Sequence, residues 1–214
     1  MKHILVYSDS ISWGIIPMTR NRFDFNLRWP GILEQNLNAQ GQEVRVIEDC
    51  LNGRRTIYDD PIRPGRNGLI GLSQQIEIHS PLSLIILMLG TNDFQANHDH
   101  TAEDAKIGMR TLIYAIKNTV LEPGMKMPEI LVVSPPPILD PKGDIAAKFK
   151  GAKKKCIGLA EAYQSLCKAE QCHFFDAASV TTSSKVDGVH FDADQHVVFG
   201  NAITDFIRQH INIV

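Results

Sequence analysis

The sequence lacks the long apolar segments and paired cysteines that mark several classes of protein. None of its 214 residues belongs to a run approaching the roughly 20 apolar residues that cross a bilayer, so no membrane span is expected. The chain passes from Met1-Lys2-His3 directly into an apolar segment without a cleavable signal, which predicts a cytoplasmic protein. Neither a CxxC pair nor zinc-ligand spacing occurs, so free thiols are expected at Cys50, Cys156, Cys167 and Cys172.

Several catalytic motifs are also missing. There is no G-x-S-x-G elbow, Walker A loop, H-E-x-x-H or G-x-G-x-x-G after a strand, which disfavours the usual α/β-hydrolases, P-loop enzymes, zinc proteases and dinucleotide enzymes. A net charge of -2 and a pI near 6.4 give no electrostatic reason to expect a nucleic-acid partner. The Lys153-Lys154-Lys155 run is read as a solvated helix face, and His98-Asp99-His100 is read as a solvated loop rather than a metal site.

What is present is typical of a globular enzyme. The 43% hydrophobic and 21% charged shares and the length predict one domain over residues 1–214. Short apolar runs rich in β-branched residues predict strands at His3–Tyr7, Val44–Glu48, Leu84–Leu89, Ile130–Ser134 and His173–Phe175. Longer amphipathic segments between them predict helices near Trp29–Ala39, Leu69–His79, Ala102–Thr119, Ala146–Ala169 and Ala193–Gln209.

The alternation of strands and helices predicts an α/β fold with three layers, in which helices cover both faces of a parallel sheet. The unbroken apolar run Leu84–Leu89 fits a central strand that is buried on both faces. Ligands bind beyond the carboxyl ends of the strands in such sheets. Two long loops, Asn52–Gly68 and Pro135–Asp144, lie at that edge and are expected to form pocket walls or subunit contacts.

Polar residues follow three of the predicted strands. Ser10 lies after the first, in Tyr7-Ser8-Asp9-Ser10-Ile11, where it is either an exposed nucleophile or part of a helix cap. Gly90-Thr91-Asn92-Asp93 ends the third strand; it is either a turn or the source of an Asn92 amide that binds a developing oxyanion. Asn52-Gly53 after the second strand is either an Asn-Gly turn or a source of a backbone N–H donor.

The run Asp187-Gly188-Val189-His190 places a carboxylate three residues before an imidazole, just ahead of the last predicted helix. A histidine exchanges protons near neutral pH, and a nearby carboxylate holds it in one tautomer. By itself the pair is equally typical of an ordinary Asp-Gly turn. Together with Ser10 it suggests an enzyme.

Taken in order, these four motifs resemble those of the SGNH (GDSL) hydrolases over nearly the whole chain. Further segments resemble the arylesterase/acyltransferase branch: Trp13-Gly14, Arg28-Trp29, Val46-Ile47-Glu48, Asp59-Asp60-Pro61, Met88–Asp93, Val132–Pro137 and Phe174–Ala177. The resemblance implies a flavodoxin-like sheet with strand order 2-1-3-4-5. It also departs from the family at Ser8, because the first block of the family usually begins with glycine.

The resemblance implies a serine esterase of small-molecule esters that needs neither metal nor cofactor. Ser10 would be the nucleophile, His190 the base and Asp187 its orienting partner. The oxyanion hole would be formed by Ser10, Gly53 and Asn92. Substrate contacts are expected from Asp9, Trp13, Phe94, Ile138 and Val189, and the branch also suggests acyl transfer or perhydrolysis and a homo-oligomer.

Other functions remain open at this point. A carbohydrate acetylesterase or a lysophospholipase or thioesterase would share the triad and differ in the pocket. Ile15, Ile16, Phe94 and Ile138 would decide whether an apolar channel exists for a longer acyl chain. A non-catalytic binding protein that kept the fold is a further alternative, although such a protein has no need of all the catalytic residues.

Overall fold

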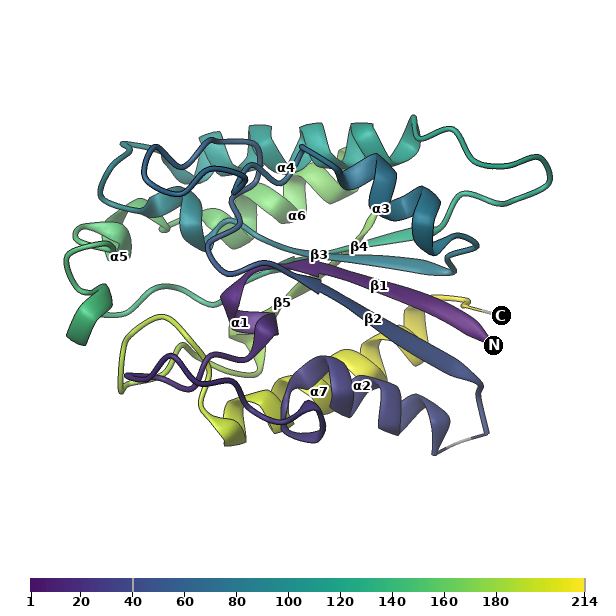
Figure 1. Cartoon of the computed structure of the whole chain (residues 1–214), viewed down its shortest axis with the longest axis horizontal. Helices are drawn as coiled ribbons and strands as arrows, with labels where there is room; N and C mark the ends of the chain where they lie inside the picture. Colours follow the sequence, from purple (N-terminus) through teal and green to yellow (C-terminus); the bar gives the residue numbers. More distant parts are fainter. Residues whose placement is uncertain (40, 214) are drawn as a thin grey trace.

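The protein forms a three-layer α/β/α sandwich in a computed structural model that describes residues 1–39 and 41–213 (Figure 1). Gln40 and Val214, both within the predicted domain, lie outside the described residues. Five parallel strands run in the order β2-β1-β3-β4-β5, as the family resemblance implies. They are β1 (Lys2–Ser8), β2 (Val44–Cys50), β3 (Leu84–Met88), β4 (Glu129–Ser134) and β5 (His173–Asp176).

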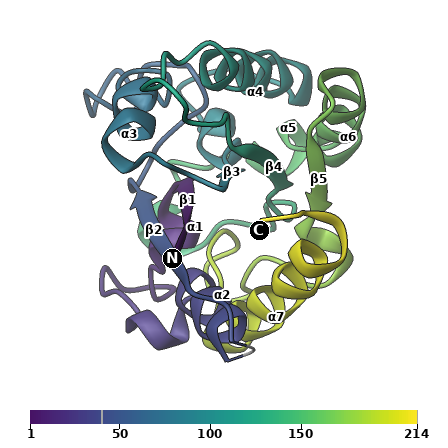
Figure 2. The same ribbon diagram turned by 90° about the vertical axis from the view of Figure 1, so that its right-hand side faces the viewer.

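Helices cover both faces of this sheet (Figures 1 and 2). One face carries α3 (Leu72–His79), α4 (Ala102–Lys117) and α6 (Leu159–Glu170), and the other carries α2 (Trp29–Asn38) and α7 (Ala193–His210). Two further helices are short: α1 (Ser10–Trp13) and α5 (Ala152–Lys155). Short 3₁₀ turns occur at Phe25–Leu27, Thr91–Phe94, Gly143–Ile145 and Ala177–Ser179. Two apolar clusters, one on each side of the sheet, form the core.

The pattern of apolar residues explains why these elements form. All five residues of β3 are buried, as expected for a strand covered on both faces. Helix α4 buries residues three and four apart, including Ala105, Met109 and Leu112. Its first turn is closed by a capping box between Thr101 and Asp104, which satisfies otherwise unpaired backbone N–H groups.

One predicted helix is wrong. The segment Ala146–Ala169 is divided into α5 and α6 because Gly151 and Gly158 adopt left-handed backbone conformations with φ of 82° and 86°. Such a conformation ends a right-handed helix, and glycine adopts it without steric penalty. The other four predicted helices begin and end within three residues of the observed ones.

The carboxyl ends of the strands meet on the left of Figure 1, and the long loops gather at this edge. In the loop Asn52–Gly68, Arg55 forms an isolated parallel bridge with Asn67, so the loop has an ordered backbone. Within residues 1–39 and 41–213, every helix is too short or too polar to cross a membrane.

Candidate active site

Ser10 lies just beyond the carboxyl end of strand β1, which is flanked by β2 and β3, and it is the first residue of α1. The cap of this helix is the neighbouring Asp9, whose Oδ1 accepts a hydrogen bond from the Ile11 N–H at 3.0 Å. The motif was interpreted as a helix cap or as a nucleophile, and the structure divides these roles between two residues. Asp9 caps the helix, and the Ser10 hydroxyl takes no part in the cap. Ser10 remains 7% exposed at the edge of the sheet.

The Ser10 hydroxyl meets the imidazole of His190. The Ser10 Oγ lies 3.1 Å from His190 Nε2, and His190 Nδ1 lies 2.6 Å from Asp187 Oδ2. Ser10 and His190 are 180 residues apart in sequence, and the fold alone brings them together. A nucleophile, a base and a carboxylate joined in this order form the geometry of a serine hydrolase triad.

Asp187 is held as a carboxylate. Burial raises the pKa of its carboxyl, but hydrogen bonds from the His190 ring and from the Val189 and His190 backbone N–H groups outweigh this, and the net pKa is lowered. An ionised Asp187 keeps a proton on His190 Nδ1 and leaves Nε2 free to accept one from Ser10.

The loop Pro135–Asp144 fixes the turn that carries Asp187 and His190. The Leu139 N–H donates to the Gly188 carbonyl at 2.9 Å, and the Lys142 N–H donates to the Asp187 carbonyl at 3.0 Å. This loop thus positions the triad through backbone hydrogen bonds, in addition to lining cavities at this edge.

The backbone N–H groups of Ser10 and Gly53 indicate a site for an oxyanion beside the Ser10 hydroxyl. Gly53 adopts a φ of 86°, a conformation that side-chain-bearing residues rarely take. Among the described residues, neither the Gly53 N–H nor the Ser10 N–H donates a hydrogen bond. Both donors line the same recess with Asn92 and His190, and they are therefore available to an incoming oxygen.

Asn92 is more constrained than the sequence suggested. Its Nδ2 donates to Asp9 Oδ2 at 2.9 Å and to the Arg54 carbonyl at 3.1 Å, while its Oδ1 accepts from Gln95 Nε2 at 2.7 Å. Both amide hydrogens thus have partners within the protein. Asn92 can act on an oxyanion only by sharing one of these hydrogens in a three-centre bond.

Asp9 connects the nucleophile to this amide. Its carboxyl is fully buried, and desolvation raises its pKa to about 6 despite hydrogen bonds from the Ile11 N–H and Asn92. Above this pH the carboxylate accepts from both groups and joins α1 to the Thr91–Phe94 turn. Asp9 was expected to contact substrate, but its 1% exposure makes it part of the interior.

Asp93 holds the loop that carries Gly53. Its carboxylate accepts from the Thr56 N–H at 2.9 Å and from the Thr56 hydroxyl at 2.5 Å. Burial raises its pKa to about 7, although these hydrogen bonds and the nearby Arg55 lower it. No sequence pattern indicated this role, because Thr56 is 37 residues away and lies in a loop without a motif.

Ser8 stands where the family usually has glycine, and its side chain points into the core. Its Oγ donates to the Met88 carbonyl at 2.7 Å and lies 2.6 Å from the Ser12 Oγ, which accepts from Trp29 Nε1. The Ser8 hydroxyl is fully buried, and its partners belong to α1 (Ser12) and β3 (Met88). It therefore neither crowds Ser10 nor adds a polar group to the recess.

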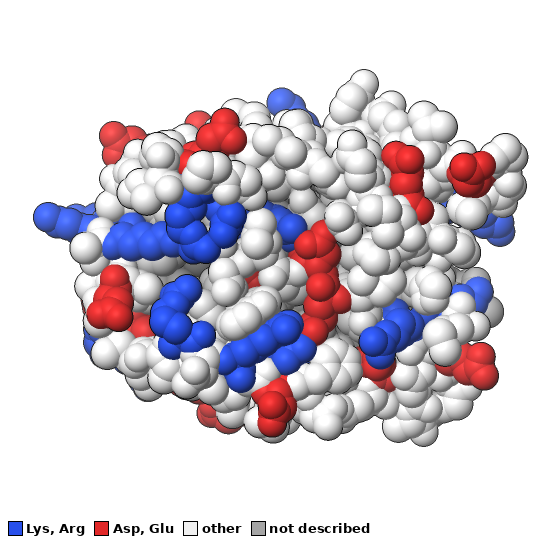
Figure 3. All heavy atoms as spheres, in the orientation of Figure 1, with Lys and Arg blue, Asp and Glu red and all other residues white. Residues whose placement is uncertain are grey.

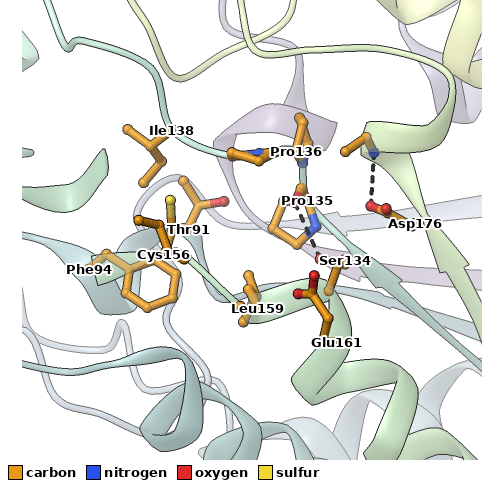
Figure 4. Close-up of a pocket in the computed structure, with 15 residues that line it drawn as sticks. Thr91, Phe94, Ser134, Pro135, Pro136, Ile138, Cys156, Leu159, Glu161 and Asp176 are labelled. Carbon is orange, nitrogen blue, oxygen red and sulfur yellow. Dashed lines mark hydrogen bonds between the residues drawn. The ribbon is translucent and has the colours of Figure 1, made fainter. Parts of the chain in front are cut away.

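The side chains that were expected to bind substrate do not surround Ser10. Phe94 and Ile138 line a separate cavity of about 310 Å³ near the ends of β4 and β5, opposite Glu161 and Asp176 (Figure 4). Val189 is 1% exposed in the core, and Trp13 packs against the α2 and α7 side of the sheet. The lining of that larger cavity includes none of Ser10, Asn92 and His190.

The space next to Ser10 is small and has different walls. A recess of about 20 Å³ is lined by Ser10, Ile15, Arg20, Asn52, Gly53, Arg63, Asn92, Ile145, Lys148, Phe149 and His190. A second cavity of about 70 Å³ joins His190 and Asp187 with Ile15, Met18 and Ile145. Lys148 and Phe149 were missed because they fall within Ala146–Ala169, which was read as one long helix, and Ile145 lies directly before that segment.

Histidine and cysteine side chains elsewhere form no evident site. Within the described chain, no three His, Cys, Asp or Glu residues are grouped as metal ligands, and all four cysteines are free. His98 and His100 stack on each other with ring centroids 4.6 Å apart, while Asp99 faces solvent.

Comparison with known proteins identifies the family. The profile of the GDSL-like lipase/acylhydrolase family matches residues 9–198, a range that includes Ser10, Asp187 and His190. The chain belongs to this family. It is therefore a carboxylic ester hydrolase of the serine type, as its sequence motifs predicted.

Several GDSL-family structures are similar over almost the full length. The native M. smegmatis aryl esterase is 36% identical, with a TM-score of 0.92 over 98% of this chain and 99% of that chain. A carbohydrate acetylesterase family member from Sinorhizobium meliloti is 35% identical, with a TM-score of 0.90 over 98% of both chains. An arylesterase of Vibrio mimicus is 33% identical over 91 residues, a match that spans 42% of this chain and 37% of that protein.

Proposed function

We propose that this protein hydrolyses short-chain acyl esters through a covalent acyl-enzyme formed on Ser10. The observation that carries the proposal is the continuous hydrogen-bonded series from Ser10 Oγ to His190 at 3.1 Å and from His190 to Asp187 at 2.6 Å. Its position at the carboxyl edge of a parallel sheet is where such folds bind ligands. Family membership supports the same reaction class.

The reaction proceeds in two steps. His190 Nε2 accepts the Ser10 proton as Oγ attacks the ester carbonyl carbon, and the same proton then passes to the departing alcohol. A water molecule next gives a proton to His190 and attacks the acyl-enzyme, which releases the acid and restores Ser10. Asp187 stabilises the imidazolium form of His190 in both steps.

The tetrahedral oxyanion would be bound by the backbone N–H groups of Ser10 and Gly53. Donors that are already in place are effective because they need no reorganisation during the reaction. Asn92 would add a weaker, shared hydrogen bond, since both of its amide hydrogens already have partners.

The small space around Ser10 favours a short acyl group. The two cavities that reach His190 measure about 20 and 70 Å³, whereas sites for drug-sized ligands commonly span about 300–1,000 Å³. A short acyl group such as acetyl suits spaces of this size, whereas a lysophospholipid or a fatty acyl thioester would need much more room than these two cavities provide.

A carbohydrate acetylesterase is the second candidate. Two structures of this description, both from Sinorhizobium meliloti, match 98% of the chain with TM-scores of 0.90 and 0.91. The acyl group would be the same, and only the alcohol would differ. Acetylated xylose, compared with aryl acetates at equal concentration, distinguishes the two.

The central experiment measures turnover of p-nitrophenyl esters from acetate to decanoate by the wild-type protein and Ser10→Ala. We expect activity to be greatest with acetate or butyrate and to fall by about 10⁵-fold or more in the variant, since the nucleophile of a triad is indispensable. Wild-type turnover that persists in a folded Ser10→Ala variant would contradict the proposal. Failure of a fluorophosphonate probe to label Ser10 would instead favour a binding protein.

We also propose acyl transfer to alcohols or peroxide, and a homo-oligomeric state in which neighbouring subunits narrow the pocket. Both rest on resemblance to the acyltransferase branch and on the loops Asn52–Gly68 and Pro135–Asp144 at the edge of the site. A monomer mass by light scattering at micromolar concentration would contradict the oligomer. The cytoplasmic location stays a prediction from sequence.

A further inference from the structure

Three cationic side chains line the recess that contains Ser10. They are Arg20, Arg63 and Lys148, which come from three separate segments of the chain and meet at this point. The proposed hydrolysis of a neutral aryl ester uses none of them. Their presence beside the nucleophile therefore requires an explanation of its own.

Two of these cations lie close to the backbone of Gly53, one of the proposed oxyanion donors. A Cβ atom placed on Gly53 would lie 3.6 Å from Arg63 Nη1 and 3.9 Å from Lys148 Nζ. Both charged groups are thus close enough to the Gly53 backbone to contact a small ligand that is bound there. Arg63 and Lys148 are each only partly exposed, so solvent screens them less than it screens a fully exposed pair.

Apart from a contact of Lys148 Nζ with the Phe149 ring, 5.9 Å from its centroid, the three side chains have no hydrogen-bonding or ion-pair partner within the described residues. No hydrogen bond or ion pair engages the side chain of Arg20, Arg63 or Lys148 in that part of the chain. Neighbouring arginines behave differently: Arg54 pairs with Asp49 at 2.7 Å, and Arg66 donates to the carbonyl oxygens of Asn52 and Pro64.

The acidic groups nearby do not neutralise the cluster. Asp60 accepts from the Ile62 and Arg63 backbone N–H groups and lies 3.4 Å from the fully buried Arg55. Asp144 is exposed and lines the adjoining cavity, which also contains Arg20 and Lys142. Desolvation lowers the pKa of Lys148, and the nearby Arg63 lowers it further, while Asp60 partly offsets this effect.

The local excess of positive charge contrasts with the whole chain, which has a net charge of -2. Figure 3 shows Lys and Arg atoms grouped on the left half of the face, the side on which Figure 1 places the strand ends. Converging charges in a recess concentrate a ligand of the opposite sign. Cations that are partly shielded from water, such as Arg63 and Lys148, gain more from an anionic ligand than fully hydrated ones do.

We name the entrance of this recess, which is lined by Arg20, Arg63 and Lys148, the mouth. We propose that the mouth selects esters that carry an anionic group, such as a carboxylate, phosphate or sulfate, close to the scissile ester bond. Arg63 and Lys148 would bind the anion through charge-assisted hydrogen bonds, and Arg20 would add long-range attraction. The inference rests on the proposed esterase function and specifies its substrate class. It applies to a charge on either the acyl or the alcohol side of the ester.

The test compares kcat/KM within two matched pairs of chromogenic esters. One pair carries the charge on the alcohol: 3-acetoxy-4-nitrobenzoate and its neutral 3-acetoxy-4-nitrobenzamide. The other carries it on the acyl group: 4-nitrophenyl hydrogen glutarate and its neutral methyl ester. After correction for spontaneous hydrolysis, we expect the anionic member of at least one pair to be favoured by about ten-fold or more.

Variants assign this preference to the mouth. Arg63→Gln and Lys148→Gln should each lower the anionic-to-neutral ratio several-fold, and the double variant should abolish it. The exposed residues Lys150 and Arg110 provide matched controls, and Lys150→Gln and Arg110→Gln should leave the ratio unchanged. Raising salt from about 0.01 M to about 1 M should also weaken the preference, since the Debye length shortens from about 30 Å to about 3 Å.

The outcomes separate the two proposals. Equal kcat/KM within both pairs, with hydrolysis that still depends on Ser10, would overturn the anionic preference and leave the esterase function intact. A preference that survives in the folded double variant would overturn the assignment to Arg63 and Lys148. Absence of Ser10-dependent hydrolysis with every ester would overturn the esterase function and this inference together.

Discussion

The floor and the mouth of the active site are both polar, but they are built in opposite ways. At the floor, Asp9, Asn92 and Asp93 are buried, and each has hydrogen-bond partners from other segments. At the mouth, Arg63 and Lys148 are partly exposed and have no such partner among the described residues. Polar groups of the floor satisfy one another, whereas those of the mouth are left for a molecule from outside.

This difference reflects two separate tasks. A buried polar group without a partner costs about 1–3 kcal/mol, so the hydrogen bonds of Asp9, Asn92 and Asp93 help the floor to hold its shape. The mouth remains partly hydrated and tolerates unpaired charge at a lower cost. We therefore expect the floor to hold the catalytic geometry, and we propose that the mouth selects the substrate.

The largest effect should come from Asp187→Asn, which changes the Asp187–His190 pair, a buried pair like those of the floor. The new amide would present an N–H to His190 Nδ1 and favour the wrong imidazole tautomer, so kcat should fall by about 10⁴-fold. Turnover of p-nitrophenyl acetate measures this. The control Asp194→Asn, at an exposed site in the first turn of α7, should retain wild-type activity. A loss below ten-fold in Asp187→Asn would mean that Asp187 does not orient the base.

A smaller effect is expected for Asn92→Ala. An oxyanion donor commonly contributes about 10²–10³-fold to kcat, and a shared hydrogen should place Asn92 at the lower end of this range. The split between kcat and KM is the informative measurement, because loss of a transition-state contact lowers kcat and leaves KM nearly unchanged. An unchanged kcat in a folded variant would show that the amide only holds Asp9 and the Arg54 carbonyl in place.

The smallest change concerns stability rather than rate, at Asp93. Because burial raises its pKa from 3.8 to about 7, the native state binds a proton between these values that the unfolded state does not. Its contribution to the free energy of unfolding is therefore greatest at low pH and is lost as pH rises through about 7. Asp93→Asn removes this dependence while keeping a group able to bond Thr56.

Urea unfolding of wild type and Asp93→Asn at pH 5 and pH 8 checks this sign. Relative to wild type, the variant should become more stable as pH rises, by about 1.4 kcal/mol for each unit of the pKa shift that lies within the window. A difference that is identical at both pH values would show that the Asp93 carboxyl does not change its protonation on folding.

Sequence periodicity predicted the regular elements and missed interruptions that depend on single residues. The strands and the four helices with continuous apolar faces lie where they were expected. The segment Ala146–Ala169 failed because its apolar spacing continues across Gly151 and Gly158, where the backbone turns left-handed. The periodicity of side chains does not reveal the sign of φ at a glycine.

The sequence by itself determined the reaction class, because Ser10, Asn92 and the Asp187–His190 pair each lie at a strand end or directly before a helix. Topology then brings such positions to one edge of a parallel sheet. Only the tertiary structure decided what surrounds them: that Asp9 and Asn92 bind each other, that Phe94 and Ile138 line another cavity, and that Arg63 and Lys148 approach Gly53 in a recess that Arg20 also lines. Those contacts join segments far apart in the chain, through loops whose paths no local pattern encodes.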